Sequence, residues 1–253
     1  ANFARDRETP VAVSKVQPVQ IEEKLGTSEL PELMKSTPSV YATKQGGGFG
    51  DSRINIRGFS QQNIAVLING VPVNDMENGS VYWSNWANLA DVTKTIQVQR
   101  GLGASKLAVS SVGGTMNIIT QSTDAEAGGT VYQSMGNDNY SKTSFSVSTG
   151  LLDNGWAVTL QGSKSSGDGF VNATNFESYS YFFNVSKRIN ESHRLSLTGF
   201  GAPQWHNRRS SPHLINVYRE EEAGIKYNSD YGYLNGELYN TAYAYNEYHK
   251  PQF

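Results

Sequence analysis

The chain contains no cysteine among its 253 residues. This absence excludes disulfide bonds, thiolate nucleophiles, iron–sulfur clusters and zinc sites built on cysteine. It leaves the cellular compartment open, because cysteine-free chains occur in every compartment.

The chain also lacks an excess of charge of either sign. Its 21 basic and 23 acidic residues give a net charge of -2 and are scattered along the sequence. Proteins that bind nucleic acid or an anionic membrane surface usually carry a basic patch or stripe. We therefore expect no nucleic-acid partner.

Long apolar runs are missing as well. The longest one, residues 64–68, is far shorter than the roughly 20 residues of an apolar spanning helix. With 37% hydrophobic residues the composition would suit a soluble protein, and only as a β-barrel could such a chain cross a bilayer. No charged-then-apolar leader stands at Ala1, so we expect any export signal to lie upstream or to have been removed.

The first half of the chain, to about residue 125, mixes helix and strand signals. Residues 32–35 are predicted to form a short helix, because Pro31 precedes them and the Ser-Thr-Pro sequence at 36–38 ends the pattern. Short apolar runs separated by glycine or asparagine turns follow at 54–56, 64–68, 96–98 and 116–119. This is the pattern of a small α+β domain.

From about Gly128 large apolar residues alternate with small polar ones. Tyr179 and Tyr181, for example, share one face of a strand, and Ser180 points to the other. The alternation predicts strands at 129–136, 140–150, 155–164, 177–189 and 193–202, and none is obvious from Pro203 until near the end. One apolar and one polar face suit a membrane barrel with a wet lumen. On pattern alone, a soluble β-sandwich is favoured over the barrel.

Three strings in the first half follow one another in a fixed order. Residues 54–59 read Ile-Asn-Ile-Arg-Gly-Phe, residues 66–73 read Val-Leu-Ile-Asn-Gly-Val-Pro-Val, and residues 96–120 run from Ile-Gln-Val-Gln-Arg-Gly to Gly-Gly-Thr-Met-Asn-Ile-Ile-Thr. In order and spacing they resemble the plug domain of TonB-dependent outer-membrane receptors, here of a Bacteroidetes-like kind. The sequence departs from the family pattern at Asn69, Leu102, Ala104 and 108–109, which affects the expected loop at 102–109.

The resemblance implies the fold class: an α+β plug domain over residues 1–125, followed over 126–253 by antiparallel strands of a transmembrane β-barrel. About five strands cannot close a barrel, because an open edge in hydrocarbon leaves backbone groups unpaired. Barrels that hold a plug have roughly 22 strands. We therefore expect the chain to be the N-terminal portion of a longer polypeptide, with the TonB box upstream of Ala1.

Two arginines are predicted to join the plug to the barrel. Arg57 and Arg100 each end an apolar strand and are followed by glycine, which lets the backbone turn sharply. In the family such arginines face carboxylates of the barrel wall, so the resemblance implies a polar, breakable contact whose acidic partners lie beyond Phe253. The alternative is that both are ordinary surface arginines.

Two groups of residues are candidates for ligand contact, because aromatic rings with polar tips suit a wet binding cavity. The resemblance places the first group at the outward apex of the plug and the second in outer loops. The first comprises Phe49, within the glycine run 46–50, with Tyr82, Trp83 and Trp86, and the second comprises Trp205, His206 and Arg208. For Trp83 and Trp86 buried packing is an equal alternative.

No catalytic or metal chemistry is indicated. The glycine runs lack the spacing of a phosphate loop, and His206 with His213 forms a poor metal ligand set because no carboxylate is near them in sequence. Asp153, Asp168 and the run 220–222 have the setting of solvated loops. We therefore expect no enzymatic activity, no metal and no cofactor.

The resemblance implies a nutrient importer in the outer membrane of a Gram-negative bacterium. The expected partners are TonB, through a segment upstream of Ala1, an extracellular small-molecule or oligomeric ligand, outer-membrane lipid, and a surface lipoprotein. Siderophores, haem, cobalamin, oligosaccharides and peptides all remain open as substrates. The alternative from another class is a β-rich surface adhesion protein that binds a ligand without transporting it.

Overall fold

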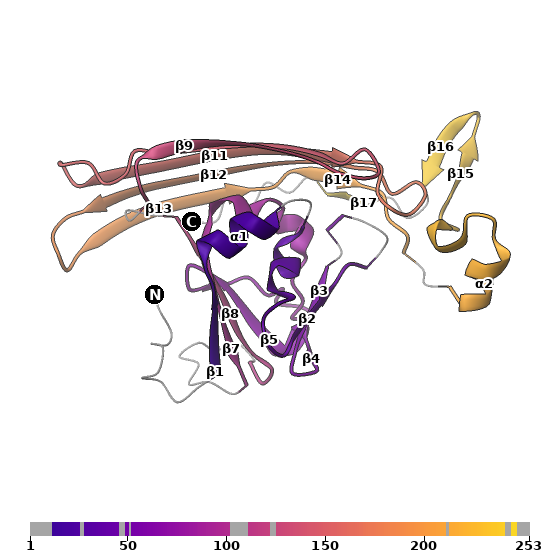
Figure 1. The fold of residues 1–253 in the computed structure, drawn as a ribbon, viewed down its shortest axis with the longest axis horizontal. Coiled ribbons are helices and arrows are strands. Elements are labelled where there is room, and N and C mark those ends of the chain that lie inside the picture. The colour runs from indigo at the N-terminus through magenta and orange to yellow at the C-terminus, as the bar shows by residue number, and fades with distance from the viewer. Residues whose placement is uncertain are drawn as a thin grey trace.

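The computed structural model shows a globular domain and a large sheet that lies across one side of it (Figure 1). The described residues are 12–25, 28–45, 49–50, 52–101, 111–121, 125–210, 213–240 and 244–246. The loop expected at 102–109 and the expected entry segment before residue 12 lie outside them.

A mixed five-stranded sheet forms the centre of the globular domain. Its strand order is β1-β7-β8-β5-β6, and only β5 and β8 pair in parallel. The bounds are β1 Ala12–Val16, β5 Ile64–Ile68, β6 Val71–Pro72, β7 Thr93–Arg100 and β8 Gly114–Thr120. The strands predicted from the apolar runs at 64–68, 96–98 and 116–119 are therefore confirmed.

A second, three-stranded sheet and several short helices complete this domain. The strands are β2 Val40–Thr43, β3 Arg53–Ile56 and β4 Phe59–Ser60. The helices are α1 Pro18–Leu25, and the 3₁₀ helices η1 Leu30–Met34, η2 Gln61–Asn63, η3 Trp83–Trp86 and η4 Leu89–Val92. Among the described residues, every helix falls short of the length and apolar character needed to cross a membrane.

The helix predicted at 32–35 is a 3₁₀ helix that begins earlier, at Leu30, with Pro31 in its first turn. The Glu32 side chain accepts a hydrogen bond from the Glu29 backbone N–H at 3.0 Å, which satisfies one of the free donors at the helix start. Helix α1 was not predicted, because eight residues hold too little periodicity to be separated from a loop.

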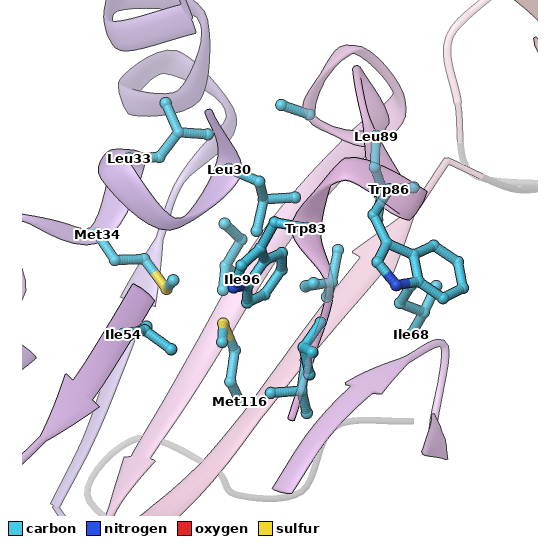
Figure 2. Packing of buried hydrophobic residues seen from close by; sticks show 14 of the residues in the cluster. Leu30, Leu33, Met34, Ile54, Ile68, Trp83, Trp86, Leu89, Ile96 and Met116 are labelled. Atoms are coloured by element: carbon cyan, nitrogen blue, oxygen red, sulfur yellow. The ribbon is translucent and has the colours of Figure 1, made fainter. Parts of the chain in front are cut away.

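The core lies between the central sheet and the short helices. In Figure 2, Met34, Ile54, Ile96, Met116 and Trp83 converge from five different elements. All five are less than 5% exposed, and full burial of such a side chain contributes about 1.5–3 kcal/mol. The same cluster includes Phe182 and Phe200 of the large sheet, so the apolar core continues across the junction of the two parts.

The large sheet is antiparallel and contains seven strands. Their bounds are β9 Gly128–Met135, β10 Ser141–Ser148, β11 Trp156–Gly167, β12 Phe176–Arg188, β13 Arg194–Gly201, β14 Gln204–His206 and β17 Ala244–Asn246. All five predicted strands are confirmed, with ends shifted by one to three residues.

The expectation that no strand follows Pro203 until near the end is wrong. Strand β14 pairs with β12 directly after β13, and a separate hairpin is formed by β15 Tyr231–Leu234 and β16 Glu237–Asn240. With α2 Ile215–Glu220 and η5 Gly224–Lys226 this hairpin lies beyond one end of the sheet (Figure 1). Three- and four-residue strands are too short for alternation to identify them.

The large sheet exposes an apolar face and buries a polar one, which is the reverse of the arrangement in a soluble protein. The face turned away from the domain is apolar and exposed, and it carries Val131, Phe145, Val147, Trp156, Leu160, Tyr179, Tyr181, Leu195, Leu197 and Trp205. The face toward the domain is mostly polar and buried, and it carries Lys142, Ser144, Thr159, Gln161, Ser163, Ser165, Ser178, Ser180, Gln204 and His206. An apolar outer and a polar inner face are what a strand needs between lipid and a wet interior.

Candidate functional site between the globular domain and the sheet

A cavity of about 700 Å³ lies between the globular domain and the large sheet. The domain lines it with Glu29, Lys44, Phe49, Trp83, Trp86 and Asn88, and the sheet and its loops with Tyr140, Lys142, Phe170, Phe176 and Arg209. Its size is that of a small-molecule site, and its walls combine aromatic rings with a few charged groups.

The side chain of Glu29 fixes one edge of this cavity. Its carboxylate accepts hydrogen bonds from the Gly50 backbone N–H, at 2.7 Å, and from the Ser52 hydroxyl. Gly50 has φ +79°, and a Cβ at this position would lie 2.5 Å from the Ser84 Cβ. Only glycine fits here, and the chain is thereby held so that Phe49 reaches the sheet.

Phe49 belongs to an aromatic cluster, formed by Phe49, Tyr140, Phe176 and His206, that joins the domain to the sheet. The Phe49 and Phe176 rings stack with centroids 4.5 Å apart and planes 12° apart. The His206 ring lies 5.7 Å from Phe49, and Tyr140 lies 6.2 Å from Phe176. Ring pairs at these separations contribute about 0.5–1.5 kcal/mol beyond burial.

A buried ion pair forms a second link between the two parts. Lys142 Nζ of β10 lies 2.6 Å from Asp91 Oδ1 of η4, and both side chains are only 4% exposed. The Ser144 hydroxyl and the Gln161 amide donate hydrogen bonds to Asp91 Oδ2, at 2.8 and 3.3 Å. We call Asp91, Lys142, Ser144 and Gln161 the Asp91 cluster.

Electrostatics at the cavity is governed by burial. Desolvation raises the pKa of Glu29, although its hydrogen bond from Ser52 and the charge of Lys44 act in the opposite direction. Desolvation, helped by the charge of Asp91, also raises the pKa of Tyr140 in the turn before β10. The Tyr140 phenol is therefore neutral at physiological pH and can donate a hydrogen bond into the cavity.

The two candidate tryptophans are buried. Trp83 is 4% and Trp86 is 7% exposed, which agrees with the packing alternative. Trp83 Nε1 donates to Gln61 Oε1 at 3.1 Å, and the Trp86 ring stacks on Phe200 of β13 with centroids 5.8 Å apart. Both also line the cavity, so their contact with ligand stays a prediction.

The other candidate ligand residues are not brought together. Tyr82 is 52% exposed and accepts a hydrogen bond from Asn78. Trp205 and His206 are neighbours in β14 and therefore point to opposite faces of the sheet. Trp205 packs against Tyr179 on the outer face, and His206 is buried under Phe49. Arg208 is exposed in the loop that follows. Ligand contact by these residues also stays a prediction.

Arg57 and Arg100 lie close together at the far end of the domain. β7 starts directly after η4, whose Asp91 contacts the large sheet, and Arg100 is its last residue. The strand runs away from the large sheet (Figure 1). Arg57, with φ 52°, places its Nη1 beside Gly101, and Arg100 Nη1 donates to the Pro38 carbonyl at 3.4 Å. Neither pairs with a carboxylate of the described residues. The contact of Arg57 and Arg100 with carboxylates of the barrel wall stays a prediction.

Sequence reasoning missed Glu29 and the Asp91 cluster. A signal for the cluster existed, because Lys142 and Ser144 share the strand face opposite Phe145, and a lysine on an inward face needs an acidic partner. The identity of that partner could not be read, since Asp91 is 51 residues away. Glu29 gave no signal beyond its place before Pro31.

Comparisons with known proteins agree with this architecture. The TonB-dependent Receptor Plug Domain model matches residues 5–115. The vitamin B12 transporter BtuB of Vibrio vulnificus is 25% identical over 195 residues, which cover 74% of this chain and 31% of the relative. The ferric enterobactin receptor of Pseudomonas aeruginosa is 30% identical over 129 residues, which cover 46% of this chain and 17% of the relative.

Solved structures show the same fold. The siderophore receptor PirA of Acinetobacter baumannii matches with a TM-score of 0.63 at 20% identity, over 77% of this chain and 32% of that one. FpvA of P. aeruginosa, in complex with a heterologous pyoverdine, matches with a TM-score of 0.69 at 16% identity, over 88% of this chain and 29% of FpvA. The chain spans about a third of the length of the vitamin B12 transporters that it matches.

Proposed function

This chain carries the plug domain and the first barrel strands of a TonB-dependent outer-membrane receptor, and from that premise we propose that the complete protein imports a scarce nutrient by displacing its plug. We further propose that the plug comprises residues 1–125 and that the barrel wall begins at residue 126. Henceforth the globular domain is the plug and the large sheet is the wall.

The observation that carries the proposal is the contact between plug and wall. Most of the buried residues on the inner wall face are polar, such as Ser163, Ser178 and Ser180, although Phe176, Phe182 and Phe200 make apolar contacts across the junction. A polar contact can exchange its partners for water when it opens, whereas separating two apolar faces would expose them. The contact therefore suits a plug that has to move.

The partners follow from this role. TonB engages a segment upstream of Ala1, an extracellular ligand binds at the plug apex and outer loops, and lipid covers the apolar outer face of the wall. A surface lipoprotein is a further partner. Arg57 and Arg100 contact carboxylates of the remaining wall, and Phe49, Tyr82, Trp83, Trp86, Trp205, His206 and Arg208 are the proposed ligand contacts.

The substrate is a siderophore, haem, cobalamin, an oligosaccharide or a peptide. Relatives named for vitamin B12 and for ferric enterobactin match the chain at similar identity, and this similarity does not choose between them. The transport needs no covalent chemistry, which agrees with the receptor and transporter names of these relatives.

The test is growth of the source strain on each substrate class as the limiting nutrient. We expect growth on one class to be lost when either the receptor or TonB is deleted, and to return when the receptor is restored. Uptake that does not depend on TonB would refute the mechanism. Outer-membrane fractions that contain the protein in a heat-modifiable form would separate it from the adhesion alternative.

A further inference from the structure

A row of polar side chains crosses the inner face of the wall and begins at the cavity. Ser165 of β11 lines the cavity and is paired in register with Ser178 of β12, which is itself paired with Gln204 of β14. Side chains opposite each other in an antiparallel pair lie side by side on one face. His206 shares this face two residues farther along β14. We call Ser165, Ser178, Gln204 and His206 the polar row.

Three members of the polar row hold buried polar atoms that have no hydrogen-bond partner in the part of the chain that the structure describes. These atoms are the Ser178 hydroxyl oxygen, both the nitrogen and the oxygen of the Gln204 amide, and His206 Nδ1. The three side chains belong to residues that are 0%, 1% and 4% exposed. A buried polar atom without a partner costs about 1–3 kcal/mol, so we expect these groups to meet a partner when the protein works.

The ring of Phe49 covers one end of the polar row. Phe49 stacks on Phe176, which is paired with His206 in the sheet, and the centroids of the Phe49 and His206 rings are 5.7 Å apart. Phe49 and Phe176 also line the cavity. The polar row therefore borders the cavity at Ser165, and the Phe49 ring is the group that a ligand in the cavity has to displace to reach His206.

The unpartnered groups are neutral, and they include both donors and acceptors. The Ser178 hydroxyl can donate and accept, and the Gln204 amide offers two N–H donors beside an acceptor oxygen. A ligand hydroxyl has the same dual character, so several hydroxyls on one ligand can satisfy the whole set. A carboxylate or a phosphate only accepts, and it would leave the Gln204 oxygen without a partner.

The charges around the cavity also favour an uncharged ligand. Ferric catecholates and haem carry negative charges that would need basic groups free to bind them. The basic side chains that line the cavity are already occupied, because Lys44 lies 3.4 Å from Glu32, Lys142 is paired with Asp91, and Arg209 donates to the backbone carbonyls of Ile225 and Tyr227.

Aromatic rings provide the rest of the recognition surface. Six of them line the cavity, namely Phe49, Trp83, Trp86, Tyr140, Phe170 and Phe176. Such rings offer a large and rigid contact area, on which the C–H face of a sugar can stack. Flat apolar surfaces beside neutral hydrogen-bonding groups suit a ligand that has both C–H faces and hydroxyls.

We infer that the polar row is a hydroxyl-binding subsite of the cavity, and that its ligand is a neutral oligosaccharide whose hydroxyls pair with Ser178, Gln204 and His206 once the Phe49 ring has moved aside. A peptide fits less well, because its charged termini would need free charged partners. The inference rests on the proposed function for the import of a nutrient, and it narrows the substrate to one class.

The experiment measures binding to the complete receptor, purified in detergent, by isothermal titration calorimetry. The neutral probes are maltoheptaose, cellohexaose, xylohexaose and mannohexaose, and the comparison probes are ferric enterobactin, haemin, cyanocobalamin and a tripeptide. We expect one of the neutral oligosaccharides to bind and the comparison probes to fail. Binding of a comparison probe in place of the oligosaccharides, or no binding of any oligosaccharide, would overturn the inference.

Two substitutions test the subsite itself. Gln204→Leu and Ser178→Ala should each weaken binding of the oligosaccharide about tenfold, since each removes hydrogen bonds made only to the ligand. Both should keep or raise the thermal midpoint of the ligand-free receptor, because they remove buried polar atoms that have no partner in it. A purely structural role would not produce this combination.

Ser163→Ala is the matched control. Ser163 is buried on the same face of the wall, but its hydroxyl lies 2.6 Å from that of Ser180 and is therefore already paired. We expect this variant to lower the thermal midpoint and to leave the affinity unchanged. Unchanged affinity in Gln204→Leu and Ser178→Ala, or a loss of stability in them as large as in Ser163→Ala, would refute the subsite.

The covering role of Phe49 has its own measurement. Phe49→Ala removes the ring over His206, so we expect the oligosaccharide to associate faster, as followed by stopped-flow tryptophan fluorescence. An association rate that this substitution leaves unchanged would show that Phe49 is not the cover.

Failure of this inference can be told apart from failure of the proposed function, because binding in detergent needs no TonB. Oligosaccharide binding together with growth that is independent of TonB would refute the import mechanism alone. Growth that depends on TonB but requires a nutrient other than an oligosaccharide would refute the ligand assigned to the polar row and leave the import mechanism intact.

Discussion

At the scale of single residues, Glu29 has the least expected role. Its partly buried carboxylate holds Gly50 and Ser52, and through them positions Phe49 against the wall. A carboxylate that accepts two hydrogen bonds would normally have a low pKa, but burial outweighs both bonds and raises the pKa of Glu29 above its ordinary value of 4.5.

A first prediction follows from the raised pKa of Glu29. The folded plug binds the Glu29 proton more tightly than the unfolded chain does. Glu29 therefore adds stability below pH 4.5, the ordinary pKa of a glutamate, and this stability is lost as pH rises through the raised pKa of the folded state. We expect Glu29→Gln to flatten this dependence, measured as the thermal midpoint of tryptophan fluorescence between acidic and neutral pH. The exposed Glu23 serves as control, and an equal slope for Glu29→Gln and Glu23→Gln would contradict the prediction.

A second prediction concerns Gly50. Gly50→Ala places a Cβ against Ser84 and requires a non-glycine residue at positive φ, so we expect the plug to lose more than about 1 kcal/mol of unfolding free energy. Gly58→Ala is the matched control, because Gly58 has a similar φ of +83° but open space around a Cβ. Denaturant unfolding of the plug measures both, and equal losses would show that the contact with Ser84 is unimportant.

At the scale of elements, the wall strands are defined by their two faces. Glycines under aromatic rings shape the outer face: Phe145 covers Gly162 and Tyr181 covers Gly201, at positions where a Cβ would collide with the ring. The inner face carries small polar residues that fit against the plug. Each strand therefore belongs to two environments at once, lipid outside and the plug inside.

A third prediction tests this assignment. Leu160 lies within β11 on the outer face and is 45% exposed, whereas Leu152 lies in the turn before β11 and is 44% exposed. Leu160→Arg should cost about 2–4 kcal/mol in lipid if it lies near the bilayer midplane, and Leu152→Arg about 0–1 kcal/mol. Denaturant unfolding of the receptor in lipid vesicles gives both values. A Leu160→Arg cost no greater than that of Leu152→Arg would place the outer face in water.

At the scale of the whole molecule, plug and wall share one apolar core and one buried ion pair. Their stabilities should therefore be coupled rather than independent. Part of the coupling lies in residues 83–92, where a tryptophan, an amide and a carboxylate contact the wall within a few residues of one another. Another part lies at Phe49, whose ring stacks on Phe176 of the wall.

A fourth prediction measures this coupling. In a double-mutant cycle, Trp86→Ala and Phe200→Ala should show an interaction energy of about 0.5–1.5 kcal/mol, because their rings stack across the junction. Trp83→Ala is the control, since Trp83 is equally buried but bonds Gln61 within the plug. Additive effects for Trp86 and Phe200 in thermal or denaturant unfolding would mean that the stack does not couple the two parts.

Much of the fold was predictable from local pattern. Alternation with a period of two located the five long wall strands and the orientation of residues such as Tyr179 and Ser180. It failed for β14 and the β15–β16 hairpin, where three or four residues cannot establish a period. The candidate ligand residues do not form one cluster, because Trp83, Trp86 and His206 are buried and Trp205 faces outward, and their contact with ligand stays a prediction.

The sequence by itself determined the five long wall strands, the side of the wall on which their side chains lie, and the plug strings, because all of these depend on neighbours within a few positions. Only the tertiary structure decided the partners of the Asp91 and Glu29 carboxyl groups. Asp91 meets Lys142 across 51 positions, and Glu29 meets Ser52 across 23. No period or motif relates residues so far apart, since their contact depends on how the plug docks on the wall, and docking is settled by the packing of all the elements together.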